Sequence, residues 1–105
     1  MPLPPALSAE QRQAALEKAA LARKARAELK ERLKMGSVNL SELLAQAEND
    51  DIVAKMKVVA VLESLPGVGK VKARRTMEEI GISETRRVRG LGAQQREALL
   101  RSFPG

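Results

Sequence analysis

Apolar residues recur at helical spacing through most of this chain. From Ser8 to Met35 no residue breaks a helix. Ser8 and Gln11 form a capping-box sequence at the start, and Gly36 is a typical C-terminal stop. The predicted helix of about 27 residues would be roughly 40 Å long. Its N-terminal half should project from the domain, because the apolar stripe is narrow. The stripe consists of Ala15, Ala22, Ala25, Leu29 and Leu33.

The pattern after this long helix predicts several shorter helices. Asn39 and Glu42 repeat the capping-box sequence and open a short helix. The apolar run from Lys57 to Leu65 fits a buried strand or a buried helix, and the lack of a partner strand favours the helix. Two more stripes follow, first Ala73, Met77 and Ile80, then Leu99, Leu100 and Phe103. We predict an all-α fold of about five helices, with a leader and long helix in residues 1–36 and a compact domain in residues 37–105.

The stretch from Leu65 to Ala73 (LPGVGKVKA) joins two predicted helices through a glycine hairpin. Pro66 ends the first helix, and the glycines can adopt positive φ without a Cβ to keep a ligand away. The second helix should begin at Val71, and the free N–H groups of a helix N-terminus attract phosphate. The sequence therefore predicts a phosphate clamp made of Pro66, Gly67, Val68, Gly69, Lys70 and Lys72.

Two other interpretations compete with a phosphate clamp at this hairpin. A Pro-Gly-x-Gly segment between helices is often a turn without a ligand, and spacing alone leaves that alternative open. A nucleotide P-loop needs a glycine five positions before Gly69 and Ser or Thr after the lysine, but Ser64 and Val71 stand there. The P-loop is therefore excluded.

Positive charge gathers at both ends of the chain. The net charge is +6, with +4 in residues 1–35, −3 in residues 36–63 and +5 in residues 64–105. This distribution suggests that both ends contact a polyanion.

Two clusters carry this charge. Arg86, Arg87 and Arg89 form the densest one, and guanidinium forks suit phosphate, with a solvated loop as the alternative. On the long helix the basic residues share one arc, away from the glutamates, which favours a phosphate-facing edge over a solvated face. That basic arc contains Arg12, Arg23, Arg26, Lys30 and Lys34.

Residue types that several functions require are missing. The chain has no Cys and no His, so a thiolate site, a disulfide framework and the usual zinc site are excluded, and the commonest general base is absent. One Phe, without Trp or Tyr, provides no platform for stacking single-stranded bases. No apolar run approaches the roughly 18 residues of a membrane span. We expect a soluble, cytoplasmic protein with no cofactor, metal site or catalytic residue.

Residues 58–103 resemble the helix–two-turns–helix module of a small-subunit ribosomal protein and of formamidopyrimidine-type DNA glycosylases. The resemblance implies hairpin amides that grip a backbone phosphate without reading bases. It rests on the hairpin Leu65–Lys70, the stripe Ala73, Met77 and Ile80, Gly81-Ile82, Arg87-Val88 and the final Leu91…Leu99 helix.

The whole chain is more similar still to the actinobacterial integration host factor family. The resemblance implies an all-α nucleoid protein that binds duplex DNA, bends or compacts it, and assists phage integration together with the integrase complex. We expect a monomer in solution. By position, the hairpin and the three arginines would hold the backbone, and Arg23, Arg26, Lys30 and Lys34 would supply a second contact. The matching runs include residues 15–20, 26–30, 55–58, 62–71 and 86–92.

Two further functions stay open at this point. An RNA-binding or ribosomal component would use the same module, although the chain lacks the long basic tail of that ribosomal family. A glycosylase-type enzyme would use the amine of Pro2 after removal of Met1, but Leu3 replaces the acidic neighbour of that proline, and no zinc-finger cysteines are present.

Overall fold

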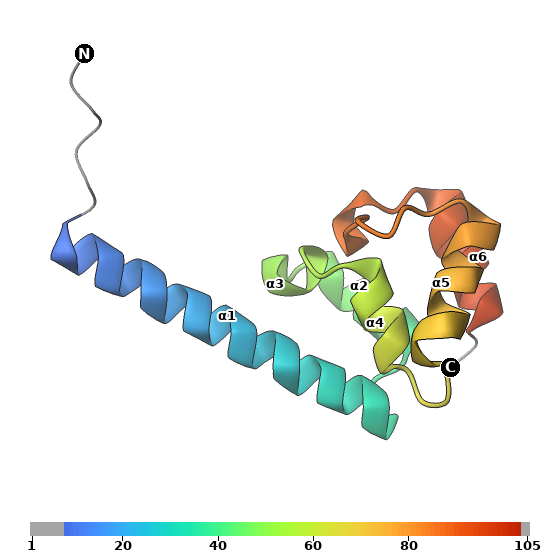
Figure 1. Ribbon diagram of the computed structural model, residues 1–105, viewed down its shortest axis with the longest axis horizontal. Helices are drawn as coiled ribbons and strands as arrows, with labels where there is room; N and C mark the ends of the chain where they lie inside the picture. The colour runs from blue at the N-terminus through green and yellow to red at the C-terminus, as the bar shows by residue number, and fades with distance from the viewer. Residues whose placement is uncertain (1–7, 104–105) are drawn as a thin grey trace, which may run out of the picture.

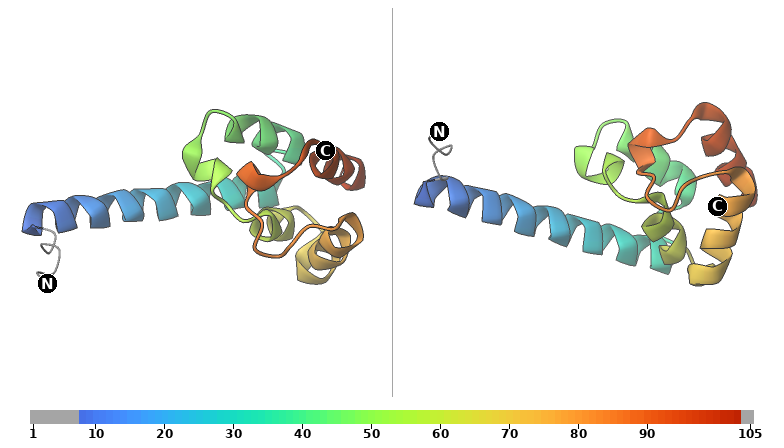
Figure 2. Two further views of the ribbon diagram at one scale, coloured as in Figure 1. Left: turned by 90° about the horizontal axis from the view of Figure 1, so that it is seen from above. Right: turned by 45° about the horizontal axis from the view of Figure 1, so that its top comes forward.

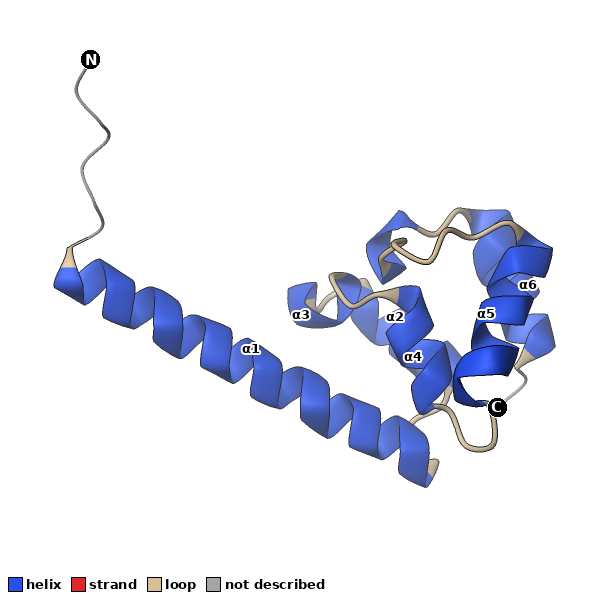
Figure 3. Ribbon diagram, viewed as in Figure 1, coloured by secondary structure: helices blue, strands red, loops and turns tan. Residues whose placement is uncertain are grey.

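The computed structural model describes residues 8–103, and within them every regular element is a helix (Figure 3). The all-α prediction is thus confirmed. The proline-rich leader, with Met1 and Pro2, lies outside the described residues. The elements are α1 (Ala9–Met35), α2 (Leu40–Ala47), α3 (Asp51–Ala54), α4 (Val58–Ser64), α5 (Gly69–Ile80), the 3-10 helix η1 (Val88–Gly90) and α6 (Ala93–Ser102).

Both predicted capping boxes are confirmed. Ser8 Oγ accepts from the N–H of Gln11 at 3.1 Å, while Gln11 Oε1 accepts from the N–H of Ser8 at 3.0 Å. Asn39 and Glu42 make the same reciprocal pair at the start of α2, with distances of 2.8 and 3.2 Å. Gly36 ends α1 at φ 77°, in the left-handed conformation that glycine adopts without strain.

The helix α1 extends well beyond the rest of the molecule, and the other helices cluster around its C-terminal half (Figures 1 and 2). Only Leu29 and Leu33 of α1 are buried, whereas Leu16 and Leu21 are 57% and 68% exposed. Leu29 and Leu33 belong to the core, so the C-terminal half of α1 is part of the compact domain. The division of the chain after residue 36 stays a prediction.

The core lies where α1, α2, α4, α5 and α6 meet, and α4 runs through it. Val58, Val61 and Leu62 of α4 are buried, which confirms that this apolar run is a buried helix and not a strand. The only β-type pairing among residues 8–103 is a single bridge between Lys57 and Arg87. Six α-helices stand where about five were predicted, because Asp50 caps the additional short helix α3 through its Oδ1 atom.

The start of α5 differs from the prediction. The sequence placed it at Val71, but the helix begins at Gly69, so the second glycine of the hairpin is also the first helical residue. Gly69 has a φ of 71°, which lies in the left-handed region. Glycine adopts this angle at the boundary of the hairpin and the helix without strain, whereas a residue with a Cβ would be strained there. At the other end Gly81 stops α5 at φ 90°.

Candidate nucleic-acid interface

The glycine hairpin between α4 and α5 exposes main-chain donors. Gly67 and Gly69 have φ values of 72° and 71°, and one hairpin hydrogen bond runs from the N–H of Val68 to the carbonyl oxygen of Leu65 at 3.2 Å. Within residues 8–103 no acceptor meets the N–H groups of Gly67, Gly69, Lys70 or Val71. Pro66 has no N–H to satisfy. Four main-chain donors are therefore free to bind an oxyanion at the start of α5.

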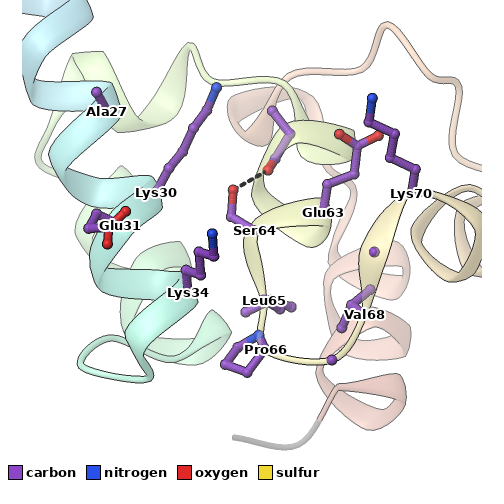
Figure 4. A pocket seen from close by; sticks show the side chains of 13 residues that line it. Ala27, Lys30, Glu31, Lys34, Glu63, Ser64, Leu65, Pro66, Val68 and Lys70 are labelled. Carbon is purple, nitrogen blue, oxygen red and sulfur yellow. Dashed lines mark hydrogen bonds between the residues drawn. The ribbon is translucent and has the colours of Figure 1, made fainter.

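A groove of about 770 Å³ opens beside these donors, and we call it the hairpin groove (Figure 4). The C-terminal half of α1 forms one wall, α4 the other, and the hairpin closes one end. Lys30 and Lys34 extend from α1 toward α4 and the hairpin, and Lys70 stands at the opposite side. The structure thus brings two of the predicted first-helix residues together with the hairpin. The groove is lined by Ala27, Lys30, Glu31, Lys34, Ala60, Glu63, Ser64 and residues 65–70.

Three other predicted residues lie away from the hairpin groove. Arg23 is exposed and Arg26 is half-buried, and both lie nearer the projecting end of α1. Lys72 is on the other side of the hairpin, where its Nζ lies 5.9 Å from the centre of the Phe103 ring. The reason is the helical turn of about 100° per residue, which carries Lys72 far around α5 from Lys70. The predicted clamp is therefore not a single surface.

The arginine loop, residues 86–90, lies at the opposite end of α4 from the hairpin (Figure 1). The loop docks on the corner between α3 and α4: the N–H of Val58 donates to the oxygen of Arg86, and the N–H of Val88 to the oxygen of Met56, both at 2.9 Å. Two of its guanidinium groups also bind main-chain oxygens. Arg86 Nη1 donates to Gly90 at 2.8 Å, and Arg87 Nη1 to Lys55 at 2.6 Å. These two arginines hold the loop in shape, in addition to carrying charge.

Sequence reasoning missed two basic residues that flank the arginine loop. Lys57 is exposed at the N-terminus of α4 and pairs with Arg87 through the bridge, and Lys55 lies two residues before it, at the end of α3. Lys55 forms a 2.9 Å ion pair with Asp51, and this hydrogen bond and its charge lower the pKa of Asp51 below the ordinary 3.8. Arg89 adds a weaker attraction to that carboxylate. The available signal was the run Lys55-Met56-Lys57, in which one apolar residue stands between two lysines.

Two glutamates in the hairpin groove also escaped the sequence analysis. Glu31 and Glu63 line the groove with the lysines, whereas the helical wheel had placed Glu31 on an arc away from the basic one. Glu28 and Glu31 are exposed even in the C-terminal half of α1, where the helix packs on the domain. Once α4 packs beside α1, the flank that carries Glu31 becomes part of a concave surface.

Outside the hairpin groove, the arginine loop and the basic arc of α1, the described residues 8–103 show no further candidate site. Arg96 of α6 forms an ion pair with Glu48 at the end of α2, at 3.3 Å. No helix between residues 8 and 103 is long and apolar enough to cross a membrane. In the same range no group of three or more His, Cys, Asp or Glu residues is placed to hold a metal ion.

Comparison with known proteins identifies the module. Residues 33–103 match the family model of the S13-like H2TH domain. A solved structure of sIHF bound to an 8-base-pair palindromic DNA aligns with a TM-score of 0.80 at 57% identity, and covers 83% of this chain and 98% of that one.

Two relatives extend the similarity to nearly the full length. The integration host factor of Mycobacterium tuberculosis is 62% identical over 99 residues, which is 94% of each chain. The integration host factor of Streptomyces coelicolor is 59% identical over 103 residues, covering 98% of this chain and 95% of the relative. The resemblance noted in the sequence is thus confirmed, and the chain belongs to the actinobacterial integration host factor family, with an S13-like H2TH domain as its core.

Proposed function

We propose that this protein is an architectural DNA-binding protein that holds duplex DNA by its phosphate backbone at the hairpin groove. The observation that carries the proposal is the group of four acceptor-free N–H donors in the hairpin, with Lys30, Lys34 and Lys70 lining the same groove. Oriented N–H groups with nearby cations suit a phosphate oxyanion. The DNA in the solved structure of sIHF supports duplex DNA as the ligand.

The same chemistry predicts little sequence preference. Main-chain amides and lysines recognise phosphates, which are alike at every base step, and so they position a duplex without specifying its sequence. None of the residues that line the groove has an aromatic side chain with which to stack bases. Affinity should therefore fall linearly with the logarithm of salt concentration, with a slope that reflects several phosphates.

Bending or compaction of DNA follows from the spread of basic residues over the molecule. The hairpin groove, the arginine loop at the other end of α4, and the basic edge of α1 with Arg23 and Arg26 are separate points for holding one duplex. Bending a short site costs about 1–6 kcal/mol, which additional phosphate contacts can offset. We propose on this basis a monomeric, non-catalytic protein of the bacterial nucleoid in the cytoplasm. Its family name further suggests that the protein assists phage integration, with the integrase complex as a partner.

A charge-matched pair of double variants tests the groove. Lys30→Gln with Lys34→Gln should weaken binding to a blunt-ended duplex about tenfold or more and flatten the salt dependence. Lys18→Gln with Lys24→Gln removes the same charge from parts of α1 that do not line the groove, and should have a much smaller effect. Equal losses in the two variants would contradict the groove as the binding site, and salt-independent binding would contradict the backbone mechanism.

One observation favours a second candidate, an RNA ligand. The H2TH domain that matches residues 33–103 is described as S13-like, and the notable similarity of that module to a ribosomal protein was already apparent in the sequence. Competition between duplex DNA and structured RNA of equal charge for the full-length protein separates the two. Preferential displacement of DNA by the RNA would favour the second candidate.

A further inference from the structure

The positive charge of the hairpin groove is partly cancelled by glutamates in its lining. Three lysines line it, Lys30, Lys34 and Lys70, but Glu31 and Glu63 line it as well, which leaves a net charge of only +1. Neither glutamate forms an ion pair within 4.0 Å in the described part of the chain. Both carboxylates are therefore held near the place where the phosphates are expected to bind.

These glutamates have no evident role in folding. Glu63 is the penultimate residue of α4, and Glu31 lies in the last two turns of α1. A negative side chain near a helix C-terminus opposes the helix dipole. Neither carboxylate accepts a side-chain or capping hydrogen bond in residues 8–103. Positions that disfavour the fold slightly, and that face a ligand groove, indicate an effect on the ligand.

Because of its location, Glu63 should affect phosphate binding more strongly than Glu31 does. Its side chain is half-buried, and in the close view it rises from α4 beside Lys70, at the edge of the hairpin (Figure 4). A carboxylate at this place repels the phosphate that the free N–H groups would bind, and part of the positive potential of Lys70 is cancelled. Glu31 lies between Lys30 and Lys34 in the sequence of α1 and lowers the potential of the opposite wall.

We propose that Glu63, assisted by Glu31, is an electrostatic brake that lowers the affinity of the groove for duplex DNA. The inference rests on the proposed function and concerns the strength of that binding. Because the net charge of the groove is only +1, binding depends mainly on the directed N–H groups of the hairpin, which act only at short range. Attraction at a distance is weak, and a bound duplex dissociates readily. A protein that covers many backbone sites can then exchange among them.

Neutral variants of the full-length protein test this brake. Glu63→Gln keeps the size of the side chain and removes its charge, and Glu31→Gln does the same on α1. The control is Glu79→Gln, which causes the same change in net charge on the face of α5 opposite Lys70. Circular dichroism should show all three folded, since no contact is lost.

The measurement is the affinity and the dissociation rate for a blunt-ended duplex without terminal phosphates, at low and high salt. Glu63→Gln should bind about three- to tenfold more tightly at low salt, chiefly through slower dissociation, and this gain should shrink at high salt because the repulsion is screened. Glu31→Gln should show a smaller gain, and Glu79→Gln little change. A gain of Glu63→Gln no larger than that of Glu79→Gln, or a loss of affinity, would overturn the brake. Absence of salt-dependent binding by the unaltered protein would overturn the proposed function as well.

Discussion

Arg87 Nη1 donates a hydrogen bond of 2.6 Å to the carbonyl oxygen of Lys55, which lies 32 residues earlier in the chain. Together with the bridge between Lys57 and Arg87, this bond fastens the arginine loop to the corner that precedes α4. Arg89 makes no hydrogen bond or ion pair within residues 8–103. Neighbouring arginines of one loop therefore have different roles, since one is structural and the other is available to a ligand.

Single alanine variants should separate these roles. Arg87→Ala removes the bond to Lys55, and it should lower the free energy of unfolding by about 1 kcal/mol and also weaken DNA binding. Arg89→Ala should leave the unfolding temperature unchanged within error while weakening DNA binding. Thermal unfolding followed by circular dichroism, with affinity measured in parallel, checks both. A loss of stability for Arg89→Ala equal to that for Arg87→Ala would contradict the assignment.

The hairpin glycines should be required for binding through their backbone conformation. Gly67→Ala and Gly69→Ala each place a Cβ on a residue with φ near 70°, which costs about 1–2 kcal/mol although nothing lies within 4 Å of the new atom. The strain should turn the free N–H groups away and reduce DNA affinity about tenfold. Gly81→Ala is the control, because it has φ 90° and equally open surroundings, far from the groove. It should lose stability but keep its affinity, and an equal loss of affinity would refute the hairpin's role.

The attachment of α1 to the domain should depend on its two buried leucines, and Leu33 is the more deeply buried of them. Leu33 is fully buried in the core, so Leu33→Ala should destabilise the protein by about 2–5 kcal/mol. Leu21→Ala makes the same chemical change on the same helix, where the side chain is 68% exposed, and should change stability by less than about 0.5 kcal/mol. Chemical denaturation measures both. Similar destabilisation by the two variants would show that the projecting half of α1 is packed in solution.

The sequence predicted those features that depend on local chemistry. The capping residues Ser8 and Asn39 and the stop at Gly36 are decided by hydrogen bonds and backbone angles within a few residues. Helical periodicity likewise identified most of the core. The ambiguous run before the hairpin needed one additional argument, the lack of a partner strand.

Features that depend on tertiary packing were not predictable in the same way. Whether Lys30 belongs to the same surface as the hairpin depends on how α1 packs against α4, and no local pattern encodes that arrangement. The same packing makes Glu31 part of the lining of the groove, although its side chain stays exposed. The bond from Arg87 to Lys55 joins residues far apart in the sequence, so the basic cluster gave no sign that Arg87 is structural.

The two hairpin lysines, which the sequence assigned to one clamp, should differ in importance. Lys70 lines the hairpin groove, whereas Lys72 lies on the other side of the hairpin, 5.9 Å from the ring of Phe103. Lys70→Ala should therefore weaken DNA binding several-fold and reduce the salt slope, because one phosphate loses its nearby cation. Lys72→Ala should have a smaller effect on binding and a slight effect on stability, since a cation–π contact with Phe103 is worth about 0.5–1 kcal/mol at an exposed site. Salt titrations of both variants, with thermal unfolding in parallel, decide the matter. A larger loss of affinity for Lys72→Ala would show that the duplex contacts the Phe103 side of the hairpin and not the groove.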